Sequence, residues 1–223
     1  MIARINFPLG PRASRPQRAA GAQFFDSCII QSVFALRGLS HYLKHFLVFI
    51  VVLASAGVVL PQRTALKLPL KNPHIVILKG KRRLQLYSDG ALVRTYQVGL
   101  GLNPVPDKVR EGDRATPEGD FYVFTKNDKS AFYLSLGISY PNIEDAERGL
   151  RDGLISRAQH DAIEKAIKQK RTPPQNTPLG GQIYIHGNGD TSDWTWGCVA
   201  LENADIKELF AAVPVGTTVV IRR

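Results

Sequence analysis

Short β-rich runs with turn signals between them dominate the chain after residue 73. Residues 74–79 (HIVILK) and 83–87 (RLQLY) have the spacing and the β-branched content of strands, and the turn sequence SDG at 88–90 leads into 92–98 (LVRTYQV). This opening predicts a meander of antiparallel strands. Further strands are predicted at 119–126, 132–137, 182–186 and 217–222.

Helical patterns interrupt these strands in two places. The first helix, predicted at 156–170, begins with a Ser-x-x-Gln capping box, and the second, predicted at 204–212, has Asn203 as its N-cap. Many short strands with few helices are typical of a mostly-β domain, either a sandwich or a barrel. The first helix lies in the long segment between the strands predicted at 132–137 and 182–186.

An uncharged apolar segment, FLVFIVVLASAGVVL at 46–60, follows a basic tail at 1–45. A helix of this length spans ~22 Å, which is short of the ~30 Å hydrocarbon core but suits a signal peptide or a signal anchor. A buried core helix fits less well because the segment has no polar face. Basic residues before the segment keep the N-terminus in the cytoplasm, so the folded part is predicted to be exported. A linker is predicted at 61–73, and the folded domain at 74–222.

Composition and charge exclude several classes of protein. Hydrophobic residues make up 44% and charged residues 22% of the 223 residues, which indicates a globular chain. Two cysteines are too few for a disulfide scaffold. Half of the net charge of +10 lies in the first 60 residues rather than in a basic stripe on the domain, so nucleic acid is not the expected partner.

The candidate chemistry lies around Cys198, the one thiol of the predicted domain, because Cys28 precedes the apolar segment. His186 ends a predicted strand twelve residues before Cys198, and a glycine-rich loop of this length can bring the two side chains together. Thiol and imidazole are the nucleophile and base of a thiol acyltransferase. Two other interpretations are a buried structural cysteine and a zinc site that adds Asp190 or Asp193.

Three motifs then resemble one known family. His-Gly at 186–187 followed by Thr-Trp-Gly-Cys-Val at 195–199 is similar to the signature of the L,D-transpeptidase catalytic domain of the YkuD type. Gly-Asp at 112–113 with Thr-Pro-Glu-Gly at 116–119 resembles the upstream turn of that family, and 216–221 resembles its closing strand. The resemblance spans about 74–222.

The resemblance implies a β-sandwich domain with a cysteine nucleophile in the bacterial cell envelope. Cys198 would be the nucleophile, His186 the base, and the Gly187 carbonyl the acceptor that orients the imidazole. The implied oxyanion hole consists of the backbone N–H groups of Trp196, Gly197 and Cys198. The neighbouring Asn188, Thr195 and Trp196 are candidate substrate contacts.

The implied donor is a peptidoglycan stem tetrapeptide, whose terminal D-alanine leaves when the thiolate attacks the third residue. The acyl group then passes to an amine of another stem peptide or of an envelope-protein lysine, as part of cell-wall synthesis and cell-shape maintenance. No metal or organic cofactor is implied. The expected location is the periplasm, with the domain anchored by the N-terminal segment or released by its cleavage. A hydrolase with the same residues and a silent peptidoglycan-binding domain are the alternatives.

Two positions depart from the family pattern. Trp196 stands where the family usually has His, two residues before the cysteine, and Ala200 stands where it usually has Arg, two residues after it. A tryptophan still supplies a backbone N–H to an oxyanion hole. The missing arginine leaves open how a substrate carboxylate is held.

The chain also has a long helical insertion at about 140–180 relative to the family pattern. This insertion is a candidate lid over the site.

Overall fold

The computed structural model describes residues 64–223, which belong to one compact unit. The predicted basic tail at 1–45 and the predicted signal or anchor at 46–60 lie outside the described residues. Between 64 and 223, no helix combines the length and the apolar character that crossing a membrane requires.

The predicted mostly-β fold is confirmed by a single curled sheet of eight strands. Their order across the sheet is β3-β2-β1-β8-β4-β5-β6-β7. Every predicted strand is present, and the two-residue β7 is an addition that the sequence did not indicate. The strands are β1 (His74–Leu78), β2 (Arg83–Ser88), β3 (Ala91–Gln97), β4 (Gly119–Ser130), β5 (Tyr133–Ile138), β6 (Tyr184–His186), β7 (Val199–Ala200) and β8 (Thr218–Arg222).

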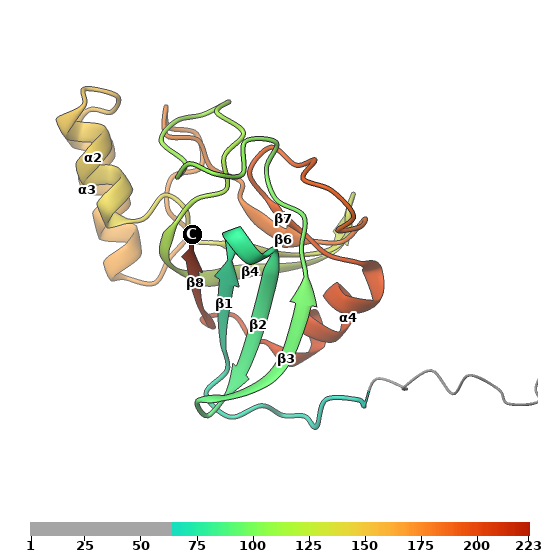
Figure 1. Cartoon of the computed structure of the whole chain (residues 1–223). Coiled ribbons are helices and arrows are strands. Elements are labelled where there is room, and N and C mark those ends of the chain that lie inside the picture. Colours follow the sequence, from blue (N-terminus) through green and yellow to red (C-terminus); the bar gives the residue numbers. More distant parts are fainter. Residues whose placement is uncertain (1–63) are drawn as a thin grey trace, which may run out of the picture. The chain divides into compact units, whose positions relative to one another are not determined.

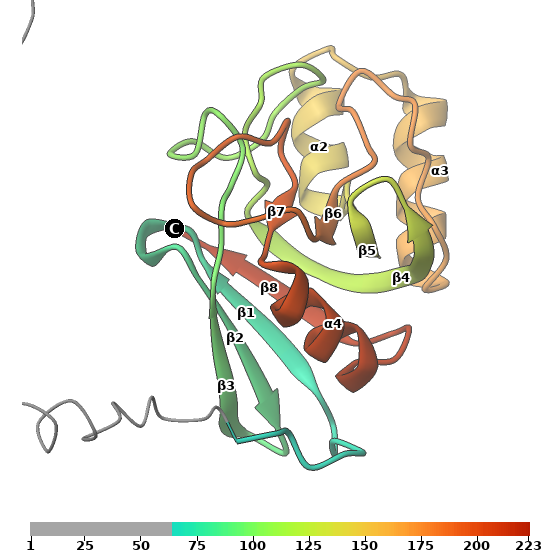
Figure 2. The same cartoon turned by 90° about the vertical axis from the view of Figure 1, so that its right-hand side faces the viewer.

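Strand β4 joins the two halves of the sheet. Its first residues pair with β8 and the rest pairs with β5, so the strand runs in a long curve from one half to the other (Figure 2). On the first half, β1, β2 and β3 form the predicted antiparallel meander, and β1 also pairs in parallel with β8. The two edges of the sheet meet where Gly99, just after β3, and Ala200 of β7 exchange both backbone hydrogen bonds, at 2.9 and 2.8 Å. The sheet therefore closes around its core.

The core is built by the period-two pattern of the strands. Ile75 and Ile77 of β1 are fully buried, and their neighbours in β2 and β8 are buried at the same period. Each such side chain contributes about 1.5–3 kcal/mol relative to an exposed one. Helix α4 (Asn203–Ala212) adds Ile206 and Leu209 to the same cluster.

Helix α4 starts one residue earlier than the sequence pattern predicted. Its N-cap is Glu202, which makes no side-chain capping bond, so the prediction of Asn203 as N-cap is wrong. The Asn203 side chain instead accepts a hydrogen bond from the Asn188 backbone N–H at 2.9 Å. This bond fastens the loop after β6 to the start of the helix.

The insertion is a helical pair with a small core of its own. Helices α2 (Ile143–Arg151) and α3 (Arg157–Lys168) lie beside each other at one side of the domain, away from α4 (Figure 1). The predicted capping box at Ser156 is present in α3, and α2 has a second one at Asn142 that was not predicted. The apolar residues of this small core are Ala146, Ile155, Ile163 and Leu179, with Leu150 and Ile167 packed against them.

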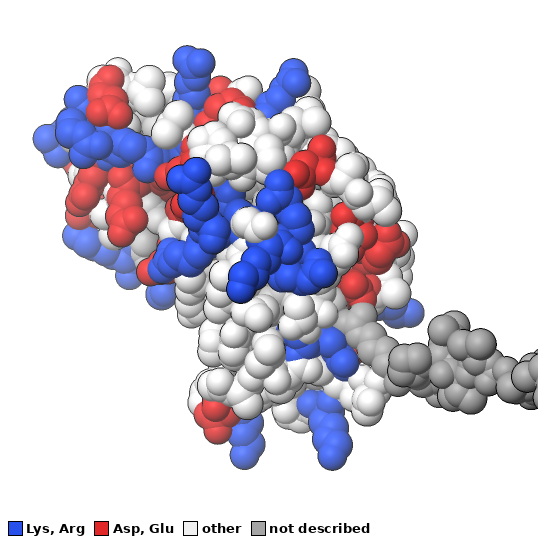
Figure 3. All heavy atoms as spheres, viewed as in Figure 1, with Lys and Arg blue, Asp and Glu red and all other residues white. Residues whose placement is uncertain are grey.

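The structure describes residues 64–73 of the predicted linker, and this segment packs along the domain. Leu66 and Leu70 pack against the main core, and the Lys71 N–H donates to Ser88 Oγ at 3.0 Å. The short 3-10 turn η1 (Lys79–Lys81) lies between β1 and β2. On the face shown in Figure 3, Lys and Arg side chains gather over this turn and the C-terminal end.

Candidate active site

His186 is the last residue of β6 and only 2% of its surface is exposed. Its ring nitrogen Nδ1 lies 2.7 Å from the carbonyl oxygen of Gly187. Because a carbonyl oxygen can only accept, Nδ1 carries the proton and donates it to this bond. The lone pair of Nε2 is therefore available to take a proton from another group.

Two aromatic side chains hold the His186 ring. Phe132, in the turn between β4 and β5, stacks on this ring with ring centroids 4.6 Å apart. Trp194 meets the ring edge-on, with centroids 5.6 Å apart. The Trp194 indole N–H donates to the Gly189 carbonyl at 3.1 Å, which fixes that ring in turn. Burial among these rings lowers the pKa of His186, against the opposing effect of the Gly187 bond, so the imidazole is neutral near pH 7.

Gly187 occupies a position that has no room for a side chain. An added Cβ would overlap Asn203 Oδ1 and would lie 2.8 Å from the Phe132 carbonyl oxygen. The Gly187 N–H donates to that same Phe132 oxygen at 3.0 Å. The glycine therefore lets the hairpin approach the strand end closely enough for Phe132 to reach the imidazole.

Cys198 lies directly before β7 and is partly exposed. Its Sγ accepts a hydrogen bond from the Tyr184 backbone N–H at 3.4 Å and donates to the Gln182 carbonyl at 3.6 Å. Burial raises the pKa of the Cys198 thiol, although the Tyr184 N–H and the charge of Lys108 act in the opposite direction. The resting site thus holds a neutral thiol and a neutral imidazole in one pocket, and no hydrogen bond joins the two in the part of the chain that the structure describes.

The turn that presents the thiol is held by two threonine hydroxyls. Thr195 Oγ1 donates to the Cys198 carbonyl at 2.8 Å and accepts the Gly197 N–H at 3.2 Å. Thr116 Oγ1 lies 3.5 Å from the same Cys198 carbonyl and accepts the Gly101 N–H at 2.9 Å. Gly197 adopts a φ of 124°, a conformation that L side chains rarely take. The cysteine backbone is therefore fixed on both sides.

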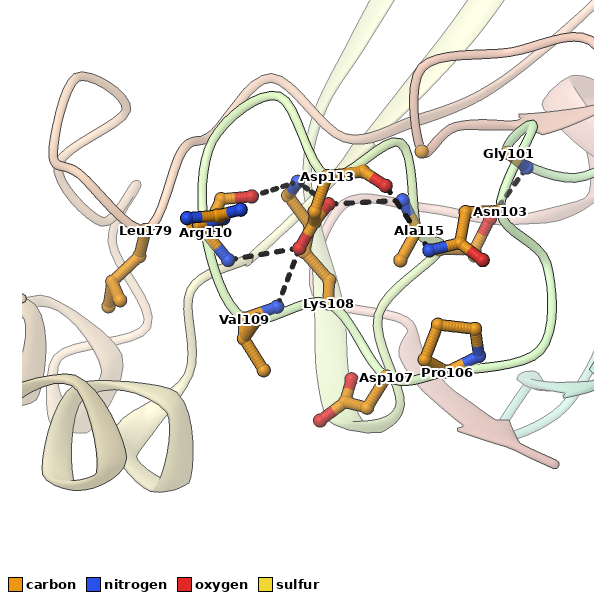
Figure 4. A network of polar contacts seen from close by, with 12 residues as sticks. Gly101, Asn103, Pro106, Asp107, Lys108, Val109, Arg110, Asp113, Ala115 and Leu179 are labelled. Carbon is orange, nitrogen blue, oxygen red and sulfur yellow. Dashed lines mark hydrogen bonds and ion pairs between the residues drawn. The ribbon is translucent and has the colours of Figure 1, made fainter. Parts of the chain in front are cut away.

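Thr116 belongs to the loop that carries the upstream motif, and Asp113 organises this loop (Figure 4). One carboxylate oxygen accepts the N–H groups of Val109 and Arg110, at 2.8 and 3.0 Å. The other accepts the Lys108 ammonium and the Ala115 N–H, at 2.8 and 3.0 Å. Burial alone would raise the pKa of Asp113, but these four bonds outweigh it and lower the pKa.

The helical insertion is fastened to this loop through Arg148. Its guanidinium donates to Asp107 Oδ2 at 3.1 Å, to the Lys108 carbonyl at 2.7 Å and to Asp145 Oδ1 at 2.6 Å. No residue of 140–180 lines the pocket beside Cys198. In this structure the insertion braces the upstream loop and lies outside that pocket.

Cys198 and His186 line one pocket of about 310 Å³, a volume within the range of small-ligand sites. Most of its other residues come from the β4–β5 hairpin, which was predicted only as two strands and not as part of the site. Two adjacent aromatic residues at 132–133, just after the polar run at 127–130, were a signal that the sequence offered. The remaining lining residues are Asn127, Lys129, Ser130, Ala131, Phe132, Ser135, Gln182 and Tyr184.

The three predicted substrate contacts lie outside this pocket. Thr195 is 3% exposed and serves the turn, and the exposed Asn188 is fastened to Asn203. Trp196 is 68% exposed, with the Arg114 guanidinium 4.7 Å from its ring centroid. Of the three N–H groups predicted for the oxyanion hole, that of Gly197 is engaged by Thr195, which leaves those of Trp196 and Cys198.

The residues of the zinc interpretation are not arranged as a ligand set. Asp193 pairs with Arg82 at 2.7 Å and accepts the Leu100 N–H at 2.9 Å. In the part of the chain that the structure describes, no three His, Cys, Asp or Glu side chains are grouped to hold a metal ion.

Comparisons with known proteins point to one family. The family model described as the L,D-transpeptidase catalytic domain (YkuD) matches residues 72–221. No curated protein matches the chain.

Solved structures with a similar fold include three bacterial proteins. The helical cell shape determining protein Pgp2 from Campylobacter jejuni is 22% identical, with a TM-score of 0.47. The matched region covers 68% of this chain and 47% of the Pgp2 chain. An L,D-transpeptidase from Xylanimonas cellulosilytica is 19% identical with a TM-score of 0.42, and the match covers 72% of this chain and 64% of that protein. An L,D-transpeptidase from Mycobacterium smegmatis is 11% identical with a TM-score of 0.41, and the match covers 68% of this chain and 59% of that protein. The chain thus spans less than two thirds of each.

Proposed function

Since the chain belongs to the family of L,D-transpeptidase catalytic domains, we propose that it is a cell-envelope acyltransferase that cuts a peptidoglycan tetrapeptide stem through a Cys198 acyl-enzyme. The observation that carries this proposal is the shared pocket of Cys198 and a His186 whose Nδ1 proton is committed to Gly187. A silent binding domain has no need of an imidazole held in that tautomer by a backbone carbonyl and two aromatic rings.

Acylation begins when the Cys198 thiol leaves the Gln182 carbonyl and passes its proton to His186 Nε2. The sulfur attacks the carbonyl carbon of the third stem residue and forms a C–S bond, while the carbonyl oxygen becomes an oxyanion. The protonated imidazole then gives its proton to the leaving amine as the C–N bond breaks. D-Alanine departs and a thioester remains on Cys198.

The oxyanion is stabilised by the backbone N–H groups that the turn leaves unoccupied, those of Trp196 and Cys198. Thr195 and Thr116 support this arrangement because both hydrogen-bond to the Cys198 carbonyl and so fix the orientation of the turn. A hydrogen-bond donor of this kind contributes about 3 kcal/mol to the transition state.

Deacylation reverses these steps with a new amine. His186 removes a proton from an amine of a second stem peptide, or of an envelope-protein lysine, as its nitrogen attacks the thioester. The C–S bond breaks and Cys198 recovers its proton through the imidazole. Discharge of the same thioester to water would make the protein a carboxypeptidase or an amidase.

The location of this chemistry follows from the predicted segment at 46–60, whose basic flank favours export of the domain to the periplasm. The predicted segment serves as an anchor in the inner membrane, or is removed after export.

Product analysis tests the transfer step. The protein is incubated with a stem tetrapeptide ending in D-alanine and an excess of an isotopically labelled amine acceptor. Transpeptidation predicts labelled amide product that accumulates faster than free tripeptide. Tripeptide alone, whatever the acceptor concentration, would assign the protein to the hydrolases.

A further inference from the structure

The pocket beside Cys198 has an uneven charge. Ten residues line it, and none is an aspartate or a glutamate. His186 is neutral because burial lowers its pKa, so Lys129 is the one permanently charged side chain among the ten. Lys129 is exposed and makes no ion pair within the described residues. Its neighbour Asp128 is also exposed but does not line the pocket.

The hairpin that carries Lys129 has a defined shape at its tip. Asn127 Oδ1 accepts the Lys129 backbone N–H at 2.9 Å, and Ser130 Oγ accepts that of Phe132 at 3.1 Å. Phe132 then stacks on His186. The same short turn therefore fixes the backbone that carries Lys129 and contacts the base, so a ligand that reaches Cys198 passes within the field of Lys129.

The position where the family resemblance expects an arginine cannot supply this charge. Ala200 is fully buried in β7, and its backbone pairs with Gly99 on one side and with β6 on the other. A cation for an anionic group of the substrate must come from another element.

We propose that Lys129 binds the free carboxylate at the D-alanine end of the donor stem peptide and so selects donors that end in a free acid. This inference rests on the proposed function. An ammonium group on a flexible stem suits a carboxylate that leaves with the departing amino acid, because it binds as a point charge without fixed geometry. Lys129 is a specificity-determining residue in this assignment and takes no part in the transfer of protons.

Donor specificity gives the first test. For Lys129→Met, KM for the free-acid tetrapeptide should rise about tenfold (about 1.4 kcal/mol) with kcat little changed. The tetrapeptide with a C-terminal amide should be used equally by both proteins. Lys129→Arg should restore most of the preference, and Lys207→Met, which removes an exposed lysine of α4 outside the pocket, should have no effect.

A charged and an uncharged alkylating agent give a second test that needs no turnover. The Cys198 sulfur attacks the CH2 carbon of either iodoacetate or iodoacetamide and displaces iodide, but only iodoacetate carries a carboxylate. Lys129→Met should lower the ratio of the iodoacetate rate to the iodoacetamide rate about threefold, and added salt should lower the wild-type ratio in the same direction.

The two tests separate the failure of this inference from the failure of the proposed function. If no donor is turned over but the alkylation ratio falls in Lys129→Met, the carboxylate site stands and the proposed reaction is wrong. An unchanged ratio together with unchanged KM values would overturn the role of Lys129. The KM difference between the wild type and Lys129→Met should vanish when the terminal carboxylate of the donor is amidated. If it vanishes instead when another carboxylate of the stem is amidated, the assignment to the D-alanine end is wrong.

Discussion

The ring of Phe132 stacks on the imidazole of His186, with centroids 4.6 Å apart and planes inclined by 29°. This contact joins the tip of the β4–β5 hairpin to the base of the proposed reaction. It excludes water from one face of the imidazole, and so contributes both to the orientation of the ring and to its lowered pKa.

Phe132→Ala should therefore slow acylation about tenfold, since such ring pairs are worth about 0.5–1.5 kcal/mol and the imidazole gains freedom to rotate. The readout is the pH profile of single-turnover acylation, whose acid limb should move to higher pH as water reaches the ring. Phe132→Leu, which keeps most of the apolar cover, is the matched variant and should shift the limb less. A limb that does not move in either variant would contradict this role.

The opposite shifts at His186 and Cys198 predict the pH dependence of the resting enzyme. Burial lowers the pKa of the imidazole, so the base stays deprotonated below the ordinary value of 6.5 and acylation should be lost only at more acidic pH. Burial raises the pKa of the Cys198 thiol, so no thiolate should be present at neutral pH.

Ultraviolet absorbance of the thiolate, followed by pH titration against Cys198→Ala, checks this prediction. The difference signal should appear only in alkaline solution, beyond the range of an ordinary cysteine. A signal at neutral pH would instead indicate a preformed thiolate–imidazolium pair.

Asp113→Asn should destabilise the domain by about 3 kcal/mol, because it removes the charge partner of a buried lysine. Asp113 and Lys108 are 11% and 3% exposed. Since the folded pKa of Asp113 is lowered, its stabilisation is fully present above the unfolded pKa near 3.8 and is lost as the pH falls through the folded value.

Urea unfolding of the wild type and of Asp113→Asn at neutral and at acidic pH measures this difference, which should shrink as the solution is acidified. Asp120→Asn is the control, because its pair with Arg222 is exposed on both sides and should change stability little. Equal effects of the two substitutions would contradict the structural role of the Asp113 network.

Gly187→Ala should lower both stability and activity, since the new Cβ meets the Phe132 carbonyl oxygen at 2.8 Å and backbone must move to relieve it. The expected destabilisation is about 1–3 kcal/mol. Gly80→Ala, whose Cβ would have its nearest neighbour at 3.7 Å, should be almost neutral. Thermal unfolding compares them, and a neutral Gly187→Ala would show that the hairpin does not need this close approach.

The fold was largely predictable because strands with one buried face leave a period-two pattern, which β1 and β2 show clearly. Strand β7 was not predictable, since two residues have no period and their pairing depends on β6 and Gly99. Asn203 illustrates another limit: its side chain suits a helix cap, but a partner 15 residues away, Asn188, uses it instead.

The site was predictable where the chemistry required particular residue types. Spacing predicted the pairing of Cys198 with His186, and the family resemblance added Gly187. The structure brings the thiol and the imidazole to one pocket. The pocket wall was not predictable, because Lys129 and Phe132 lie more than fifty residues from His186 in sequence and reach it only through the pairing of β5 with β6.

Intact mass spectrometry of the protein, after incubation with a stem tetrapeptide ending in D-alanine, detects a Cys198 acyl-enzyme itself. We expect an adduct equal in mass to the stem peptide without D-alanine, absent from Cys198→Ala and formed about 100-fold more slowly in His186→Gln. No adduct and no released D-alanine, in a protein whose Cys198 is still alkylated by iodoacetamide, would contradict the proposed acyl-enzyme.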